Sequence, residues 1–239
     1  LSEVARGGAD GAFWGARGNS GVILSQFLKG FAQAFDEDEI VVCGSADLAR
    51  ALSLATEAAY LAVGEPVEGT MLTVIRSLSE SAQEYGGGDE MDPRDLWKRA
   101  FQAGQEALAR TPEQLPVLRE AGVVDAGGMG VVVIMGGALS QLTGSDDEQV
   151  ALAVARGYTG PDSGQGRVDA RYLHSVSDTQ WGYCTQFVIS GENLSPDSIR
   201  RQFAEMYESA VVVGDGRSVR VHVHALDPGP CLSLGTCLG

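Results

Sequence analysis

The sequence has little positive charge and few aromatic residues. Of its 239 residues, 17 are Lys or Arg and 32 are Asp or Glu, so the formal net charge is −15. Such a surface repels a phosphate backbone, and the absence of any cluster of basic residues argues against a nucleic-acid partner. The longest apolar run, Gly130–Leu139, is too short to span a bilayer, and the first residues lack a signal-peptide pattern.

Cysteine is also scarce. The four cysteines form no CxxC pair and are too few for a disulfide scaffold, so we expect a protein of the reducing cytoplasm. The hydrophobic content of 44% is enough for one large domain or two modest ones. Because the sequence begins with Leu1 inside a helix-like segment, we expect it to be a fragment of a longer protein.

Residues 1–145 are predicted to form an all-α domain. Ile23, Phe27, Phe31 and Phe35 recur at a four-residue spacing that marks one face of a helix, and Asn19 or Ser20 would cap its start. Further helices are expected over residues 46–63, 70–85 and 128–142, from residue 93, and in a short segment after residue 112. Glycines and prolines separate them, and no stretch alternates as a strand does, which favours a helical bundle.

Residues 165–239 are predicted to form a small α+β domain. Strands are expected over residues 183–189, 210–213 and 219–223, with a helix over residues 195–207. Residues 143–147 and 157–166 have the composition of linkers. The glycine-containing tail with Cys231 and Cys237 need not be ordered, and the domain could be incomplete.

Three glycine-containing segments precede predicted helices: Gly15–Gly21, Pro66–Thr70 and Val123–Gly130. A helix start offers free N–H groups and the positive end of the helix dipole, and small residues let a phosphate approach the backbone. Asp125 could lie near a nucleotide or a metal, and the Thr70 hydroxyl could meet a phosphate, or each could simply cap its helix. If the helices are antiparallel, alternate helix starts gather at one end of the bundle.

A different constellation lies in the second domain. His222 and His224 are two residues apart on a predicted strand, so both imidazoles lie on one face and could share a metal ion. Cys184 could join them if its strand is a neighbour. One Cys and two His with an open fourth position is a zinc pattern of catalytic sites. The alternatives are a histidine that carries a phosphoryl group, or surface histidines beside a buried cysteine.

Several segments together resemble one known family. Gly15–Gln26, Pro66–Val74 and Val123–Gly128 resemble the DhaL-type kinase domain, in the form found in the ATP-binding subunit of bacterial fatty acid kinase. Segments similar to the middle domain of that family are Gly182–Thr185, Val212–Asp215, Val221–His224 and Asp227–Gly229. The blocks occur in the family's order and cover nearly the whole chain.

The resemblance implies a barrel of antiparallel amphipathic helices that binds ATP at one end, related to the ADP-binding subunit of dihydroxyacetone kinase. It implies phosphoryl transfer from ATP to a fatty acid, which a separate DegV-like lipid-binding protein presents, and it leaves a homodimer open. In the family, the residues matched by Cys184, His222 and His224 form a metal-associated site, with a histidine as candidate phosphate relay. The positions matched to the nucleotide are Gly18, Asn19, Ser20, Gly21, Thr70, Asp125, Gly127 and Gly128.

The sequence departs from the family at one important place. The family's domain begins with an aspartate loop of the form DGDTG that holds magnesium, and no such loop occurs in these 239 residues. Phosphoryl transfer from ATP needs cations at the transferred group, so we expect this chain alone to be a poor kinase. The alternatives are a non-enzymatic nucleotide- or zinc-binding regulatory scaffold, and a hydrolase that acts on phosphates at the zinc site.

Overall fold

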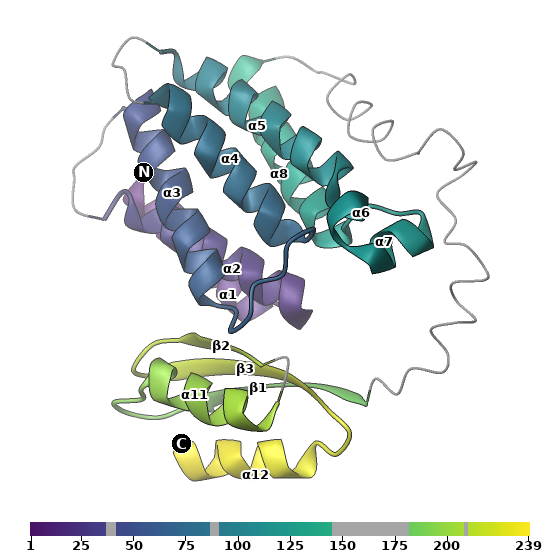
Figure 1. Ribbon diagram of the computed structural model, residues 1–239. Coiled ribbons are helices and arrows are strands. Elements are labelled where there is room, and N and C mark those ends of the chain that lie inside the picture. Colours follow the sequence, from purple (N-terminus) through teal and green to yellow (C-terminus); the bar gives the residue numbers. More distant parts are fainter. Residues whose placement is uncertain (37–41, 87–90, 145–181, 208–209) are drawn as a thin grey trace.

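The computed structural model describes residues 1–36, 42–86, 91–144, 182–207 and 210–239. A helical bundle forms one part, and a three-stranded sheet with two helices forms the other (Figure 1). The predicted linker at residues 157–166 and the third histidine, His174, lie outside the described residues. An all-α domain followed by a small α+β domain is confirmed.

The bundle contains the predicted helices, with ends that differ by one to three residues from the expected ones. They are α1 Ser2–Gly15, α2 Gly18–Gln33, α3 Ser45–Leu61, α4 Met71–Gly86, α5 Pro93–Ala109, α6 Thr111–Gln114, α7 Pro116–Ala121 and α8 Ala126–Thr143. Each of the first five helices packs on the next, and α8 returns against α4 and α5. Because α2 begins at Gly18, the predicted caps Asn19 and Ser20 lie instead in its first turn, and that prediction was wrong.

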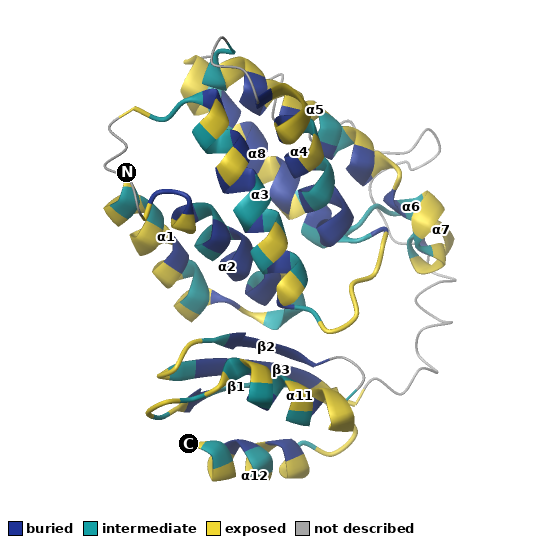
Figure 2. Ribbon diagram, turned by 60° about the vertical axis from the view of Figure 1, so that its left-hand side comes forward, coloured by how far each residue is buried: buried dark blue, intermediate teal, exposed yellow. Residues whose placement is uncertain are grey.

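The core of the bundle is built from aliphatic side chains and alanines. Leu52, Ile75 and Leu96 are fully buried in it, and Figure 2 shows such residues, in dark blue, on the inward sides of the helices. Trp97 joins α5 to α8, because its Nε1–H donates to the Met135 carbonyl over 2.9 Å. These contacts hold the helices of the bundle together.

Helix α8 is long and apolar enough to cross a membrane by length and composition, with a mean hydropathy of 1.4 over 18 residues. A core helix of a soluble protein passes the same test. Val132 and Met135 of α8 lie in the core of the bundle, and the helix packs on α4 and α5. Only 33% of this 18-residue window is buried, and Val133 and Ile134 are exposed, so α8 packs one face on the core and leaves another apolar face open.

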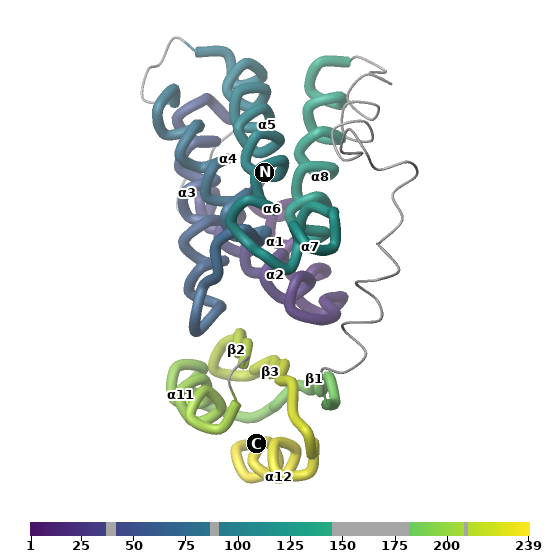
Figure 3. Tube along the Cα trace, turned by 45° about the vertical axis from the view of Figure 1, so that its right-hand side comes forward, coloured from purple at the N-terminus to yellow at the C-terminus, as the bar shows by residue number. Residues whose placement is uncertain are grey.

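The second part has the order β1 Tyr183–Ser190, α11 Pro196–Met206, β2 Val211–Gly214, β3 Ser218–Ala225 and α12 Gly229–Leu238. The sheet is antiparallel with β3 in the middle, between β1 and β2. Val219, Val221 and Val223 of β3 pack in one cluster with Phe203 of α11 and Cys231 of α12. The sheet therefore lies between these two helices and the bundle (Figures 1 and 3).

The tail, for which the sequence predicts no helix, forms the helix α12. Its sequence contains two glycines and gave no periodic signal, but Pro230 lies in the first turn, where the ring suits a helix. Gly235 lies directly against the Phe187 ring, and Cys231 is fully buried. Packing on the sheet thus stabilises a helix that propensity alone does not predict.

Candidate functional site

A cavity of about 890 Å³ lies where the bundle meets α11 and β2. Asn19 and Ser20 of α2, Thr70 before α4 and Asp125 before α8 all line it, opposite residues 204–207 of the second part. Helices α2, α4 and α8 begin at one end of the bundle because the intervening helices run the other way. The structure therefore brings together the polar side chains predicted at three separate helix starts.

The four glycines predicted at this site are not among the residues that line the cavity, and each has a packing or backbone role. A Cβ on Gly127 would lie 3.1 Å from the Ser20 hydroxyl and 3.2 Å from an Asp125 carboxylate oxygen, so its missing side chain lets these two groups approach. A Cβ on Gly128 would lie 2.8 Å from the Val74 side chain. Gly21 packs against Ala16, and the Gly18 amide bonds to a strand residue.

Asp125 caps its helix, one of the two roles considered for it, and it also lies in the wall of the cavity. Its carboxylate accepts the Gly128 N–H over 2.6 Å at the start of α8. Burial raises the pKa of this carboxyl above its usual value, while backbone N–H groups of Gly128, Met71 and Gly127 partly offset the effect. The carboxylate thus ties the start of α8 to the start of α4.

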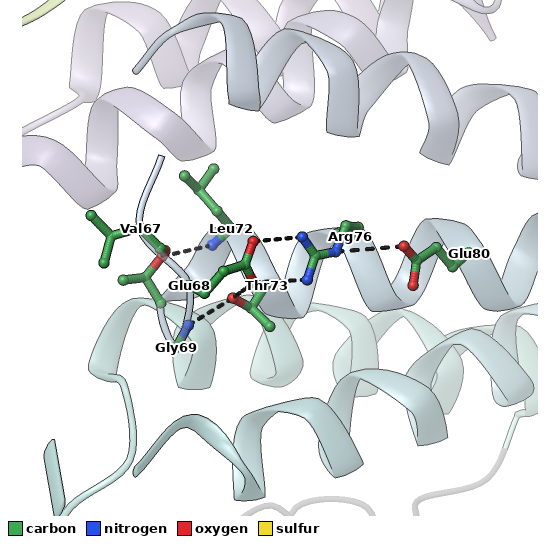
Figure 4. Close-up of polar contacts among 8 residues, drawn as sticks. Val67, Glu68, Gly69, Leu72, Thr73, Arg76 and Glu80 are labelled. Atoms are coloured by element: carbon green, nitrogen blue, oxygen red, sulfur yellow. Dashed lines mark hydrogen bonds and ion pairs between the residues drawn. The ribbon is translucent and has the colours of Figure 1, made fainter. Parts of the chain in front are cut away.

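Thr70 directly precedes α4, and side chains of α4 hold the loop of Glu68 and Gly69 before it (Figure 4). Arg76 binds both carboxylate oxygens of Glu68, and the Thr73 hydroxyl donates to Glu68 over 2.8 Å. Thr73 also accepts the N–H of Gly69, whose φ of +81° favours glycine. The Thr70 hydroxyl accepts the Leu72 N–H over 3.3 Å, so it acts as a cap beside the cavity.

Two properties of the cavity bear on what it can hold. Asn19 Oδ1 is buried without a hydrogen-bond partner among the described residues, so it is an acceptor that a ligand could satisfy. The ionisable residues of the described lining, Tyr207 apart, are the acids Glu65, Asp125 and Glu205. Helix starts attract phosphate, but these carboxylates repel it, so a polyphosphate needs a cation here.

Cys184, His222 and His224 form a cluster on the sheet. Cys184 is paired with His224 across β1 and β3, which confirms that the two strands are neighbours. The ligand atoms of the three side chains lie within 4.8 Å of one another, and Cys184 Sγ lies 3.9 Å from His222 Nε2. Soft sulfur and imidazole donors at this separation suit zinc, with room for a fourth ligand.

The two histidines differ in their surroundings. His222 is 1% exposed and its Nδ1 has no partner among the described residues, whereas His224 is more exposed. Burial, and then the neighbouring His224, lowers the pKa of His222. Its imidazole therefore stays neutral at physiological pH, which is the form that binds a metal ion.

Two residues that face the bundle have no counterpart in the sequence predictions. Gln186, paired with His222 across the strands, and Arg220, two residues before His222, both bond to the connection between α1 and α2. The sequence signal that could have pointed to them is the alternation of side chains along a strand, since it places them on the same face as Cys184 and the two histidines.

Comparisons with known families divide the chain into the same two parts, the helical bundle and the part that contains the sheet. The DAK2 domain matches residues 1–140, and the FakA-like middle domain of fatty acid kinase matches residues 180–239. The DAK2 family binds adenine nucleotides, and both families are related to kinases.

Longer bacterial proteins are similar to the whole chain. An uncharacterized protein of Staphylococcus epidermidis strain RP62A is 35% identical over 247 residues, and one of Staphylococcus aureus strain USA300 is 34% identical over 246. Each alignment covers 100% of this chain but 43% of the relative, so the chain spans less than half of their length. From the family matches and the fold, the chain belongs to the DAK2, or DhaL-type, family and resembles the FakA component of fatty acid kinase.

Proposed function

We propose that this chain is the ATP-binding part of a kinase that transfers a phosphoryl group from ATP to the carboxylate of a fatty acid. The observation that supports this most is the cavity where Asn19, Ser20, Thr70 and Asp125 meet at three helix starts. Its volume is in the range of small-molecule and cofactor sites. The unpartnered Asn19 Oδ1 and the kinase-related families fit the same interpretation.

The nucleotide's phosphates would lie at the first turns of α2 and α4. Backbone N–H groups near Asn19, Ser20 and Gly21 would donate to them, with the Thr70 hydroxyl nearby. Magnesium would supply the positive charge that the phosphates need beside Asp125 and the other acids. Because the family's aspartate loop is missing from these residues, further magnesium ligands would have to come from elsewhere, and this chain alone would have little activity.

The cluster of Cys184, His222 and His224 would hold zinc, which supplies a Lewis acid with an open coordination position. A role for one histidine as phosphate relay remains the alternative use of the same side chains. We further propose that a DegV-like lipid-binding protein presents the fatty acid, and that the complex acts in the bacterial cytoplasm. These last proposals concern the whole protein, of which the chain is a part.

Isothermal titration with ATP, with and without magnesium, tests the proposed function. We expect magnesium-dependent binding that weakens about tenfold or more in Asn19→Ala, because the variant removes a polar group from the cavity wall. Gln102→Ala, an exposed change on α5, is the matched control. Unchanged affinity in Asn19→Ala would place the nucleotide elsewhere.

Activity tests separate the alternatives. With a fatty-acid-loaded partner and ATP, the protein should form acyl phosphate, which hydroxylamine traps. A protein with no magnesium-dependent ATP affinity supports the regulatory scaffold instead. Breakdown of acyl phosphate that requires Cys184 but no nucleotide supports the hydrolase.

A further inference from the structure

Three loops carry the polar residues of the cavity, and they are held in different ways. The loop before α4 is fixed by Glu68, Thr73 and Arg76. The loop before α8 is fixed by the Asp125 cap and by Thr111, whose hydroxyl accepts the Asp125 N–H over 3.1 Å. Both sets of contacts lie within the bundle. The connection between α1 and α2, which leads to Asn19 and Ser20, is bound by its own Arg17, whose guanidinium donates to the carbonyls of Ala16 and Trp14, and in addition from the sheet.

Gln186 of β1 makes two bonds to the backbone of this connection. Its Oε1 accepts the N–H of Gly18 over 3.1 Å, and its Nε2 donates to the carbonyl of Ala16 over 3.2 Å. Gly18 is the first residue of α2, where backbone N–H groups lack partners inside the helix. The side-chain amide thus fixes the residue immediately before Asn19.

Arg220 of β3 holds the end of α1. Its guanidinium donates to the carbonyls of Ala16 and Trp14, over 3.2 and 3.3 Å, and lies 5.2 Å from the centre of the Phe13 ring. These carbonyls are at the C-terminal end of α1, where the helix dipole favours a cation. The residue is only 4% exposed, and burying a charged group costs desolvation free energy unless it is hydrogen-bonded, as it is here.

The position of the two side chains on the sheet is also informative. Gln186 faces His222 across the strands, and Arg220 precedes His222 by two residues, so both lie on the face that bears the Cys184, His222 and His224 cluster. A second connection is a bridge between Val63, after α3, and Val211 of β2, beside the cavity. The sheet therefore contacts two of the segments that form the cavity wall.

We propose that Gln186 and Arg220 are positioning residues for the nucleotide site, which hold the α1–α2 connection so that Asn19 and Ser20 face the cavity. The second domain would then complete the nucleotide site of the first without touching the nucleotide through these two side chains. This inference rests on the proposed function of the cavity. It explains why two polar side chains, the buried Arg220 and the half-buried Gln186, are directed at backbone atoms of the bundle.

Hydrogen exchange in the complete chain tests whether the side chains hold the connection. We expect exchange in residues 14–22 to be about tenfold faster in Gln186→Ala and in Arg220→Met than in the wild type. Arg220→Lys keeps donors that can reach a carbonyl, so it should restore part of the protection. Gln102→Ala and Arg201→Met, both at exposed positions, serve as controls and should leave this segment unchanged.

Titration with magnesium and ATP tests the consequence for the site. Gln186→Ala and Arg220→Met should bind ATP about tenfold more weakly, Arg220→Lys should fall between them and the wild type, and thermal unfolding should confirm that each variant is folded. Wild-type exchange in both variants, or faster exchange with unchanged ATP affinity, overturns the proposal. A wild type that binds no ATP overturns the proposed function instead, and exchange then still reports whether the sheet holds the connection.

Discussion

Asp125 is the residue at which stability and ligand binding should be separable. Replacing it with Asn keeps an oxygen that can cap α8, whereas Ala removes the cap to Gly128. Loss of such a cap costs about 0.5–2 kcal/mol, and Asn and Asp cap about equally well. The Ala variant should therefore be the less stable of the two by that amount.

The negative charge of the Asp125 carboxylate lowers the stability of the fold, whereas its cap to Gly128 raises it. Burial raises the pKa of Asp125 in the folded protein above its value in the unfolded chain. Its contribution to the free energy of unfolding is therefore most favourable at acid pH and declines as pH rises through the folded pKa. At pH 7 the ionised carboxylate is held at a cost, so Asp125→Asn should be at least as stable as the wild type.

Thermal unfolding at pH 7 measures both effects. For a protein of this size, each kcal/mol corresponds to about 2–4 °C in Tm. We expect the Tm of Asp125→Asn to equal or exceed the wild-type value and that of Asp125→Ala to fall below both, while both variants lose affinity for ATP with magnesium. An Asn variant that melts as low as the Ala variant would refute the reasoning, because it would show that the ionised carboxylate stabilises the fold.

Other changes test the two parts of the structure. Cys184→Ser should reduce bound zinc, measured by elemental analysis of the purified protein, from about one equivalent to almost none, while Cys237→Ser at an exposed position of α12 should keep it; a wild type that folds without zinc would argue against the zinc site. Gly69→Ala should lower the Tm more than Gly18→Ala: both need a positive φ, but only at Gly69 would a Cβ lie 2.8 Å from Leu115. Phe203→Ala, at a fully buried position, should cost about 3–5 kcal/mol in urea unfolding, and a smaller loss would mean that the sheet and α11 pack less tightly than described.

The helices and strands could be predicted from the sequence because the signals are local. The spacing of Ile23, Phe27 and Phe31 marks the inner face of α2, and the β-branched run at residues 211–213 marks β2. The start of α2 was misplaced because serine and asparagine are common caps but also fit a first turn. Helix α12 was missed because contacts such as that of Gly235 with Phe187 stabilise it from outside its own sequence.

The candidate site was predictable to the extent that its residues lie in short motifs. Alternation placed His222 and His224 on one face, but only the pairing of β1 with β3 brings Cys184 to them. Alternation also places Gln186 and Arg220 on this face, but it does not show what they bond to. Their partners are 168 to 206 residues away in the sequence, and they bond to backbone atoms that carry no sequence signature.

Because Gln186 and Arg220 bind the carbonyls and the amide of the α1–α2 connection, their contacts there are with backbone atoms, apart from the Phe13 ring. A substitution at Arg17 should therefore leave these backbone partners in place. A change in length is different, since one residue inserted or deleted between Ala16 and Gly18 would shift the Gly18 amide relative to the Ala16 carbonyl, and Gln186 bonds to both. In this segment, tolerance to substitution should coexist with intolerance to insertion and deletion.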